Sequence, residues 1–211
     1  MDKTSKTIET YNHHASDYEQ KFMSFASYMN KIKDFCAILK RQARILDVGC
    51  GPGNVAKVLA ESDQEFEVLG IDLSSEMIKR AGANVISPRV QFLERDIRDM
   101  GLEGKEYDAV IASFCLPHLT NEEAEKLIQD VSRVLVKGGF LYLSCMEGYK
   151  SGFETTSFSP DELIYFNYYS EEFIGRELSK NNLRLVRLQR EVYIERDGSE
   201  TMDMFFFAEK V

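Results

Sequence analysis

The chain has 211 residues, 44% of them hydrophobic and 29% charged, which predicts one soluble globular domain with a substantial core. Its formal net charge of −9 argues against a nucleic acid held mainly through its phosphates, because such binding needs a basic face. No segment is long and apolar enough to span a membrane, and residues 1–18 lack the apolar core of a signal peptide. The four cysteines form no C-x-x-C pair, so we expect neither a disulfide framework nor a metal site. A reduced, cytoplasmic protein is therefore expected.

The chain opens with two expected helices. In the first, Ile8, Tyr11, Ala15 and Tyr18 recur at three- and four-residue intervals and therefore share one face. This helix either packs on the domain as an ordinary amphipathic element or covers a bound ligand as a lid. A second helix, with an apolar stripe and with lysines on its other face, is expected over residues 28–41.

The most informative stretch is ILDVGCGPGNVA, residues 45–56. A short buried strand turns through three alternate glycines, Gly49, Gly51 and Gly53, into a helix that begins at Asn54. Glycine suits a backbone that takes positive φ and that a ligand approaches closely. Such a turn is expected to leave free backbone N–H groups at the positive end of the helix. The stretch therefore predicts a small-molecule site at the carboxyl edge of a sheet.

The spacing of these glycines bears on which ligand is bound. The dinucleotide fingerprint is G-x-G-x-x-G. Counted from Gly49, its third glycine would fall at Asn54, and counted from Gly51 it would fall at Ala56, which gives only the weaker G-x-G-x-x-A form. A nicotinamide-dependent oxidoreductase is therefore an alternative with weaker support from the motif.

A second strand is expected over residues 67–72, and it ends at Asp72, 19 positions past Gly53. In a right-handed strand–helix–strand unit the two strands are neighbours, so Asp72 is expected beside the glycine loop. A carboxylate there could accept two hydrogen bonds from a ribose diol. The alternative role is to cap the following helix, but Ser74 and Ser75 are available for that.

Two further strands lead to more candidates. Residues 90–93 form a short expected strand, followed by Asp96 and Ile97 in a loop where Asp99 is a competing acid. Residues 107–113 form the next strand, and the loop after it contains His118. A histidine in such a loop is either a structural hydrogen-bonding group or a general base.

The remaining elements are expected in the following order. A helix covers residues 121–136 and ends at a glycine C-cap, Gly138 and Gly139. A strand over 140–145 precedes an aromatic-rich segment, residues 146–169. A helix capped by Ser170 then leads to two strand-like runs, 183–194 and 202–208, and the Asp197-Gly198 turn between them predicts a hairpin.

The D-x-G-x-G-x-G pattern from Asp47 to Gly53 resembles motif I of the class I S-adenosylmethionine-dependent methyltransferases, and the later segments are similar to the family's other motifs in order and spacing. The resemblance implies an α/β fold: a three-layer, Rossmann-like, seven-stranded, mostly parallel sheet with an antiparallel C-terminal strand pair and helices on both faces. It implies a single methyltransferase domain over residues 1–211, with residues 1–41 as a helical lid and 146–169 as an insertion that covers the substrate.

The resemblance also implies S-adenosyl-L-methionine as the cofactor, held at the strand ends and under the lid. The residues implied to bind it are Tyr11, Tyr18, Asp47, Gly49, Cys50, Gly51, Gly53, Asp72, Leu73, Met77, Asp96, Ile97, Ser113 and Phe114. His118 is the candidate general base, with His13 and His14 as alternatives, and no metal is implied. The candidate substrate contacts are Glu147, Tyr149, Tyr165, Phe166 and Tyr168, each of which could instead only close the core.

The loop after the fourth strand narrows the substrate class. It reads S-F-C-L-P-H-L, whereas family members that methylate amino groups of DNA carry an Asn/Asp-Pro-Pro-aromatic loop. The resemblance is therefore to members that act on small molecules, as a monomer or a homodimer. Two alternatives remain open: a protein that binds the cofactor without turnover, and a protein or RNA methyltransferase.

Overall fold

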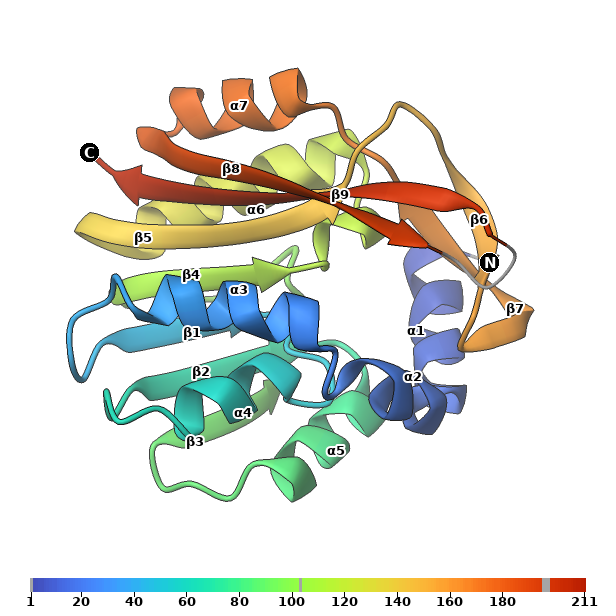
Figure 1. Cartoon of the computed structure of the whole chain (residues 1–211), viewed down its shortest axis with the longest axis horizontal. Coiled ribbons are helices and arrows are strands. Elements are labelled where there is room, and N and C mark those ends of the chain that lie inside the picture. The colour runs from blue at the N-terminus through green and yellow to red at the C-terminus, as the bar shows by residue number, and fades with distance from the viewer. Residues whose placement is uncertain (1, 103, 195–197) are drawn as a thin grey trace.

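The computed structural model describes residues 2–102, 104–194 and 198–211. A seven-stranded sheet in the order β3-β2-β1-β4-β5-β9-β8 forms its centre, and only β9 runs opposite to the other strands (Figure 1). The strands are β1 (Arg44–Val48), β2 (Glu67–Asp72), β3 (Val90–Glu94), β4 (Tyr107–Ser113), β5 (Leu135–Met146), β8 (Leu183–Ile194) and β9 (Glu200–Lys210). The predicted Rossmann-like sheet with an antiparallel C-terminal pair is thus confirmed.

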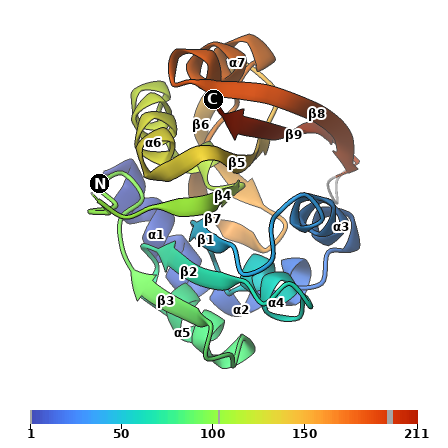
Figure 2. The ribbon, with the colours of Figure 1, turned by 90° about the vertical axis from the view of Figure 1, so that its left-hand side faces the viewer.

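Helices lie on both faces of this sheet (Figure 2). On one face lie α3 (Ala26–Cys36) and α4 (Asn54–Ala60), and on the other lie α6 (Asn121–Val134) and α7 (Glu171–Lys180). The fifth helix, α5 (Ser75–Asn84), packs on β2 and β3 and is capped by Ser74, as predicted. Among the described residues, no helix has both the length and the apolar character needed to cross a membrane.

The central strands are apolar because both of their faces are covered. Ile45 and Leu46 are both fully buried, yet Ile45 belongs to the core under α3 and α4 while Leu46 belongs to the core under α6 and α7. Successive side chains of a strand point to opposite faces, so a parallel strand between two helical layers cannot alternate apolar with polar residues. This explains why the strand positions could be predicted from short apolar runs.

The first predicted helix is two helices in the structure. They are α1 (Lys3–His13) and α2 (Ala15–Phe22), and they meet at His14, whose backbone angles, φ −103° and ψ 20°, interrupt the helix. Both lie at the carboxyl ends of the parallel strands (Figure 1). The bend lets α1 pack along β7 while α2 turns toward the sheet, so Tyr11 and Tyr18 still meet, with ring centroids 5.6 Å apart.

The predicted boundary between the helix over residues 121–136 and the strand over residues 140–145 is wrong. The helix α6 ends at Val134, and β5 begins at once at Leu135 instead of residue 140, so Gly138 and Gly139 lie within the strand. Leu135 pairs with Tyr107 and the next register pair is Phe140 with Ala109. The extra residues form a bulge in which Gly138 takes a φ of 76°, a conformation that glycine adopts without strain.

The segment over residues 146–169 contains a second, two-stranded sheet, β6 (Ser151–Thr156) and β7 (Ser159–Asn167). This hairpin lies beside α1, at the same end of the molecule as the strand tips (Figure 1). Several hydrogen bonds join it to α1, among them one from the amide of Tyr165 to Thr7 at 3.1 Å and one from the Thr10 hydroxyl to Glu162 at 3.0 Å. Strands β8 and β9 form the predicted hairpin, although Asp197 of its predicted turn lies outside the described residues.

Candidate functional site

Two adjoining cavities lie between the carboxyl edge of the sheet and the cap that α1, α2 and the β6–β7 hairpin form over it. The first cavity encloses about 740 Å³, including space open to solvent. It lies over the ends of β1, β2, β4 and the loop after β3, and α1 and α2 form its outer wall. Open α/β sheets bind their ligands at this edge.

Most of the residues implied to bind a cofactor surround the first cavity. Those in its lining are Tyr11, Tyr18, Gly49, Gly51, Asp72, Leu73, Met77, Asp96, Ile97, Ser113 and Phe114. Asp47, Cys50 and Gly53 are not in the lining. Ile8, on the helix face predicted from the sequence, also lines the cavity, whereas sequence reasoning missed Thr4 and Thr7 of α1, which lie off that face, and Arg98 of the loop after β3.

The glycine loop is shaped by two different constraints. A Cβ at Gly49 would lie 2.5 Å from Cβ of Cys115, so the loop can pass β4 only with glycine there. A Cβ at Gly51 would meet nothing closer than Tyr18 at 3.8 Å, an ordinary contact, so the φ of 52° and not crowding explains that glycine. Gly51 borders the first cavity without a side chain.

The amide groups within the glycine loop itself are engaged in hydrogen bonds. The N–H groups of Gly49 and Cys50 both donate to the carbonyl of Ile71, at 2.8 and 3.0 Å, and the N–H of Gly53 donates to the carbonyl of Cys50 at 3.1 Å. Gly51 donates to the Asp72 carboxylate at 2.9 Å. The loop thus satisfies its own donors, and it presents the carboxylate of Asp72 to the cavity.

Asp72 is held in place by backbone groups on both of its oxygens. One oxygen accepts from Gly51 N and the other accepts from Ser74 N, each at 2.9 Å. A carboxylate can accept about four hydrogen bonds, so Asp72 keeps capacity toward the cavity. Burial raises the pKa of Asp72, although these amide hydrogen bonds act in the opposite direction.

Asp47 lies beneath the same cavity and is almost fully buried, with 1% of its surface exposed. Neither carboxylate oxygen has a hydrogen-bond partner within the part of the chain that the structure describes. Burial, with a smaller effect from the nearby charge of Asp72, raises its pKa to about 8. A buried carboxylate without a partner is costly, so this site favours a ligand that brings a cationic or hydrogen-bond-donating group.

Asp96 is engaged by a bidentate ion pair. Two guanidinium nitrogens of Arg98 donate to it, Nε at 3.0 Å and the terminal nitrogen at 2.7 Å. Burial raises the pKa of Asp96, but the hydrogen bonds and charge of Arg98 outweigh it and lower the pKa overall. Arg98 also donates to Thr4 of α1 at 2.8 Å, so this pair ties the loop after β3 to the cap. The competing Asp99 is exposed and lies outside the lining.

The second cavity encloses about 910 Å³, including open space, and its walls are largely aromatic. Its rings are those of Tyr11, Tyr18, Phe22, Tyr28, Phe114, Phe158, Phe166 and Tyr193. The two cavities share a boundary formed by six residues, Tyr11, Tyr18, Gly49, Ser113, Phe114 and His118. We refer to these six residues, which line both cavities, as the junction.

His118 lies at the junction as a neutral, doubly hydrogen-bonded ring. Nδ1 lies 3.0 Å from the carbonyl of Tyr165, which can only accept, so Nδ1 carries the proton. Nε2 must then accept from the hydroxyl of Tyr11, 2.9 Å away. Burial lowers the pKa of His118 to about 4. The lone pair that a general base would use is thus occupied by Tyr11.

The wall of the second cavity contains a buried acid that sequence reasoning missed. Asp203 on β9 is 2% exposed, and it accepts a hydrogen bond from the hydroxyl of Tyr28 at 2.5 Å. The ring of Tyr28 in turn stacks on Phe114 at the junction, with centroids 4.7 Å apart. These residues come from α3, β9 and the loop after β4, so no local pattern connects them.

The structure places four of the candidate substrate contacts outside both cavities. Tyr149 is 88% exposed, Glu147 pairs with Arg190 at 2.9 Å, and the hydroxyl of Tyr168 donates to Glu154 at 3.0 Å. The ring of Tyr165 packs instead near Lys3 and Phe153, and only its backbone reaches His118. Phe166 does line the second cavity.

The two other histidines lie on the outer side of the cap. His13 Nδ1 is 3.0 Å from Glu162 of the hairpin, and His14 Nδ1 is 3.3 Å from Asp17. Neither residue is in the lining of the first or the second cavity. Their contacts hold the cap together instead of reaching the junction.

Comparisons with known proteins agree with this architecture. The profile of the family described as "Methyltransferase domain" matches residues 45–139. The chain is similar to "Putative methyltransferase YqeM" of Bacillus subtilis, 35% identical over 173 residues that cover 79% of this chain and 68% of that protein. It is also similar to the ubiquinone/menaquinone biosynthesis C-methyltransferase UbiE of Campylobacter jejuni, 30% identical over 153 residues that cover 67% of this chain and 63% of that protein.

The matches thus span about two thirds of these curated relatives. Among solved structures, the magnesium protoporphyrin IX methyltransferase of Synechocystis with bound S-adenosylhomocysteine has a TM-score of 0.73 at 17% identity, and the match covers 100% of both chains.

Proposed function

The chain belongs to the class I S-adenosylmethionine-dependent methyltransferase family, and on that premise we propose that it transfers a methyl group from S-adenosylmethionine to an O, N or C nucleophile of a small molecule. One observation carries the proposal: the cavity with the family's cofactor-binding pattern and a second, aromatic cavity meet at a shared junction. The acceptor is proposed to be small because rings from the cap and the sheet enclose the second cavity. A peptide or RNA acceptor, or binding without turnover, would be an outcome of the experiments below.

The residues of the first cavity fit the cofactor chemically. Asp72 offers acceptor capacity for a ribose diol, and Gly51 borders the cavity without a side chain. Asp47, buried without a partner among the described residues, suits the positive charge that the methionine end of the cofactor carries. We propose that Asp96 and Ile97 face the adenine and that Leu73 and Met77 pack beside it.

The bound cofactor supplies a methyl group on a sulfonium, which is already a good leaving group. The protein therefore has to hold an acceptor in line and exclude water, which is catalysis by proximity and orientation. Tyr11 and Tyr18 line both cavities at the junction, where their ring faces suit a cationic centre. We propose that residues 1–41, and α1 and α2 in particular, act as a lid within a single domain.

We propose that His118 positions Tyr11 and does not itself take a proton from the acceptor. Replacing His118 with alanine and Tyr11 with phenylalanine should then lower kcat by similar factors, roughly 3- to 30-fold, because each change removes the same hydrogen bond. The double variant should lose little more than either single variant. The measurement is kcat for all four proteins.

A direct base at His118 predicts a different result. The His118 variant would then lose far more activity than the Tyr11 variant. The activity of the natural protein would also fall as the pH drops below an apparent pKa, and the His118 variant would not show this fall. Tyr149→Phe is the matched control, because Tyr149 is exposed and lies outside both cavities. It should leave kcat unchanged.

Calorimetric titration with S-adenosylmethionine and S-adenosylhomocysteine tests the cofactor assignment. We expect micromolar binding of both, and then methylated products when small metabolites are screened by mass spectrometry. Binding without any product from small molecules, peptides or RNA would favour a binding protein. Failure of the intact protein to bind either compound would contradict the proposed function.

We also propose a cytoplasmic location, consistent with four buried free cysteines.

A further inference from the structure

Lys21 of α2 has unusual surroundings for a lysine in this protein. It is half-buried in the wall of the second cavity, and its ammonium donates to the hydroxyl of Ser157 on the hairpin. The same nitrogen lies 5.0 Å from the ring centre of Phe22 and 5.3 Å from that of Tyr193. Across the described ranges, no carboxylate lies within ion-pair distance of it.

The absence of an ion pair at Lys21 among the described residues contrasts with the composition of the chain. Acidic residues outnumber Lys and Arg by 35 to 26, and other half-buried cations are paired: Lys3 with Glu123, Lys31 with Glu191, and Arg98 with Asp96. An ammonium has three donors, and a hydroxyl with two ring faces does not replace a charged acceptor. Lys21 is therefore a cation with unused capacity inside a ligand cavity.

Aromatic rings connect this cation with the junction. Phe22, beside Lys21, lies 4.8 Å from Tyr18, and Phe158 lies 5.2 Å from Tyr18 and stacks on Tyr11 at 5.7 Å. A flat ligand that reached from Lys21 to the junction would lie among aromatic side chains over its whole length. Stacked and edge-to-face contacts favour an aromatic ligand in such a place.

We propose that Lys21 is an anion-binding subsite, and that the methyl acceptor is an aromatic carboxylate whose carboxylate contacts Lys21 while its nucleophile lies at the junction. This inference rests on the proposed function, since it names the acceptor class of the same site. The carboxylate takes the place that Ser157 holds in the ligand-free protein. Two acids, Asp17 and Asp161, line a separate groove together with Lys21, and among the described residues neither forms an ion pair with its ammonium.

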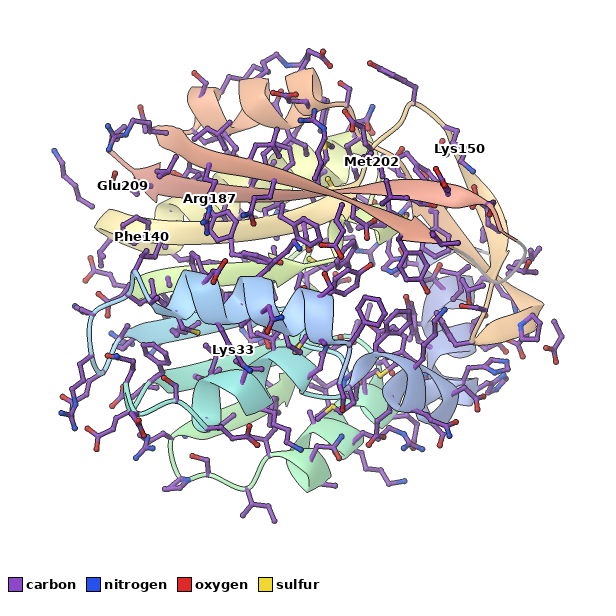
Figure 3. All side chains as sticks on the ribbon, in the orientation of Figure 1. Lys33, Phe140, Lys150, Arg187, Met202 and Glu209 are labelled. Atoms are coloured by element: carbon purple, nitrogen blue, oxygen red, sulfur yellow. The ribbon has the colours of Figure 1, made fainter. Side chains whose placement is uncertain are left out.

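The test compares 4-hydroxybenzoate with 4-hydroxybenzamide, which differ chiefly in charge, by calorimetric titration into the protein saturated with S-adenosylhomocysteine. We expect the carboxylate to bind at least tenfold more tightly than the amide. Lys21→Met should abolish this difference while binding of S-adenosylhomocysteine stays within twofold, and Lys21→Arg should restore most of it. Lys33→Met is the control, because Lys33 of α3 (Figure 3) is exposed and lines neither cavity.

Several outcomes would overturn the proposal. Equal binding of the acid and the amide would do so, as would a preference that survives in Lys21→Met. No detectable binding of either 4-hydroxybenzoate or the larger 6-hydroxy-2-naphthoate at millimolar concentration would also overturn it. Failure to bind S-adenosylhomocysteine is a separate result, which counts against the proposed function. In that case 4-hydroxybenzoate and 4-hydroxybenzamide would be titrated into the protein alone to decide the role of Lys21.

Discussion

Replacement of Asp72 by alanine is expected to weaken binding of S-adenosylmethionine at least 100-fold, which corresponds to about 2.7 kcal/mol of binding free energy. Two losses combine. The variant lacks the carboxylate that we propose accepts from the ribose diol, and it leaves the amides of Gly51 and Ser74 without their acceptor, so the glycine loop loses its fixed position. Calorimetric titration of both proteins measures the effect, and thermal unfolding shows whether the variant remains folded.

Two further variants sharpen this result. Asp72→Asn keeps a side-chain oxygen but loses the charge, and it is expected to bind more tightly than Asp72→Ala and more weakly than the natural protein. Asp99→Ala removes an exposed acid from the loop after β3, which lies outside the first cavity, and should bind normally. If the alanine variant of Asp72 bound the cofactor within threefold of the natural protein, the ribose assignment would be wrong.

Replacement of Asp47 by asparagine is expected to change stability and binding in opposite directions. In the folded protein the pKa of Asp47 is raised to about 8, against about 3.9 in an unfolded chain. Between these values the folded protein holds more protons than the unfolded chain, so its free energy of unfolding falls as the pH rises. Asparagine cannot ionise, and at pH 8 the variant should be more stable by about 2–4 kcal/mol, with the gain disappearing toward pH 4.

The same substitution should weaken cofactor binding about tenfold or more, because the ligand then meets no negative charge at Asp47. Denaturant unfolding at pH 5 and pH 8 measures the stability effect, and titration measures the binding. Asp108→Asn is a useful contrast: although burial raises the pKa of Asp108, hydrogen bonds from Lys40 and Arg44 lower it overall, so that variant should be less stable at pH 8. A variant of Asp47 that was less stable than the natural protein at pH 8 would contradict the interpretation.

Local sequence predicts the sheet and the first cavity because the relevant signals are local. Strands such as β1 and β4 are short apolar runs covered on both faces, and the residues that follow them lie at the carboxyl edge by the geometry of parallel strands. The amino-acid sequence alone therefore suffices to place Gly49 and Asp72 beside each other, and both line the first cavity. The sequence does not predict the hydrogen bonds of the glycine-loop amides, because their acceptors include the carbonyl of Ile71 and the side chain of Asp72, which only folding brings close.

The second cavity could not be predicted, since its walls come from distant parts of the chain. Tyr28 and Asp203, which form one hydrogen-bonded pair, are 175 positions apart. Phe158 lies in the turn of a hairpin that the aromatic pattern of residues 146–169 did not indicate. Of the four candidates outside the cavities, only Tyr165 lies on a strand of the hairpin, where alternation turns its side chain to the opposite face from Phe166, whereas Glu147, Tyr149 and Tyr168 lie outside both strands.

The hydrogen bonds between α1 and β7 have a consequence for the order of events in a catalytic cycle. Because Thr7 and Thr10 attach α1 to the hairpin, the wall of the first cavity and part of the wall of the second belong to one connected unit. If α1 opens as the proposed lid to release S-adenosylhomocysteine, it either carries the hairpin with it or breaks these bonds together with the contacts of Lys6 and His13 to Glu162. Exit of the two products would then be a single opening event, and Thr7→Val together with Thr10→Val would allow the acceptor product to leave while the spent cofactor remains bound.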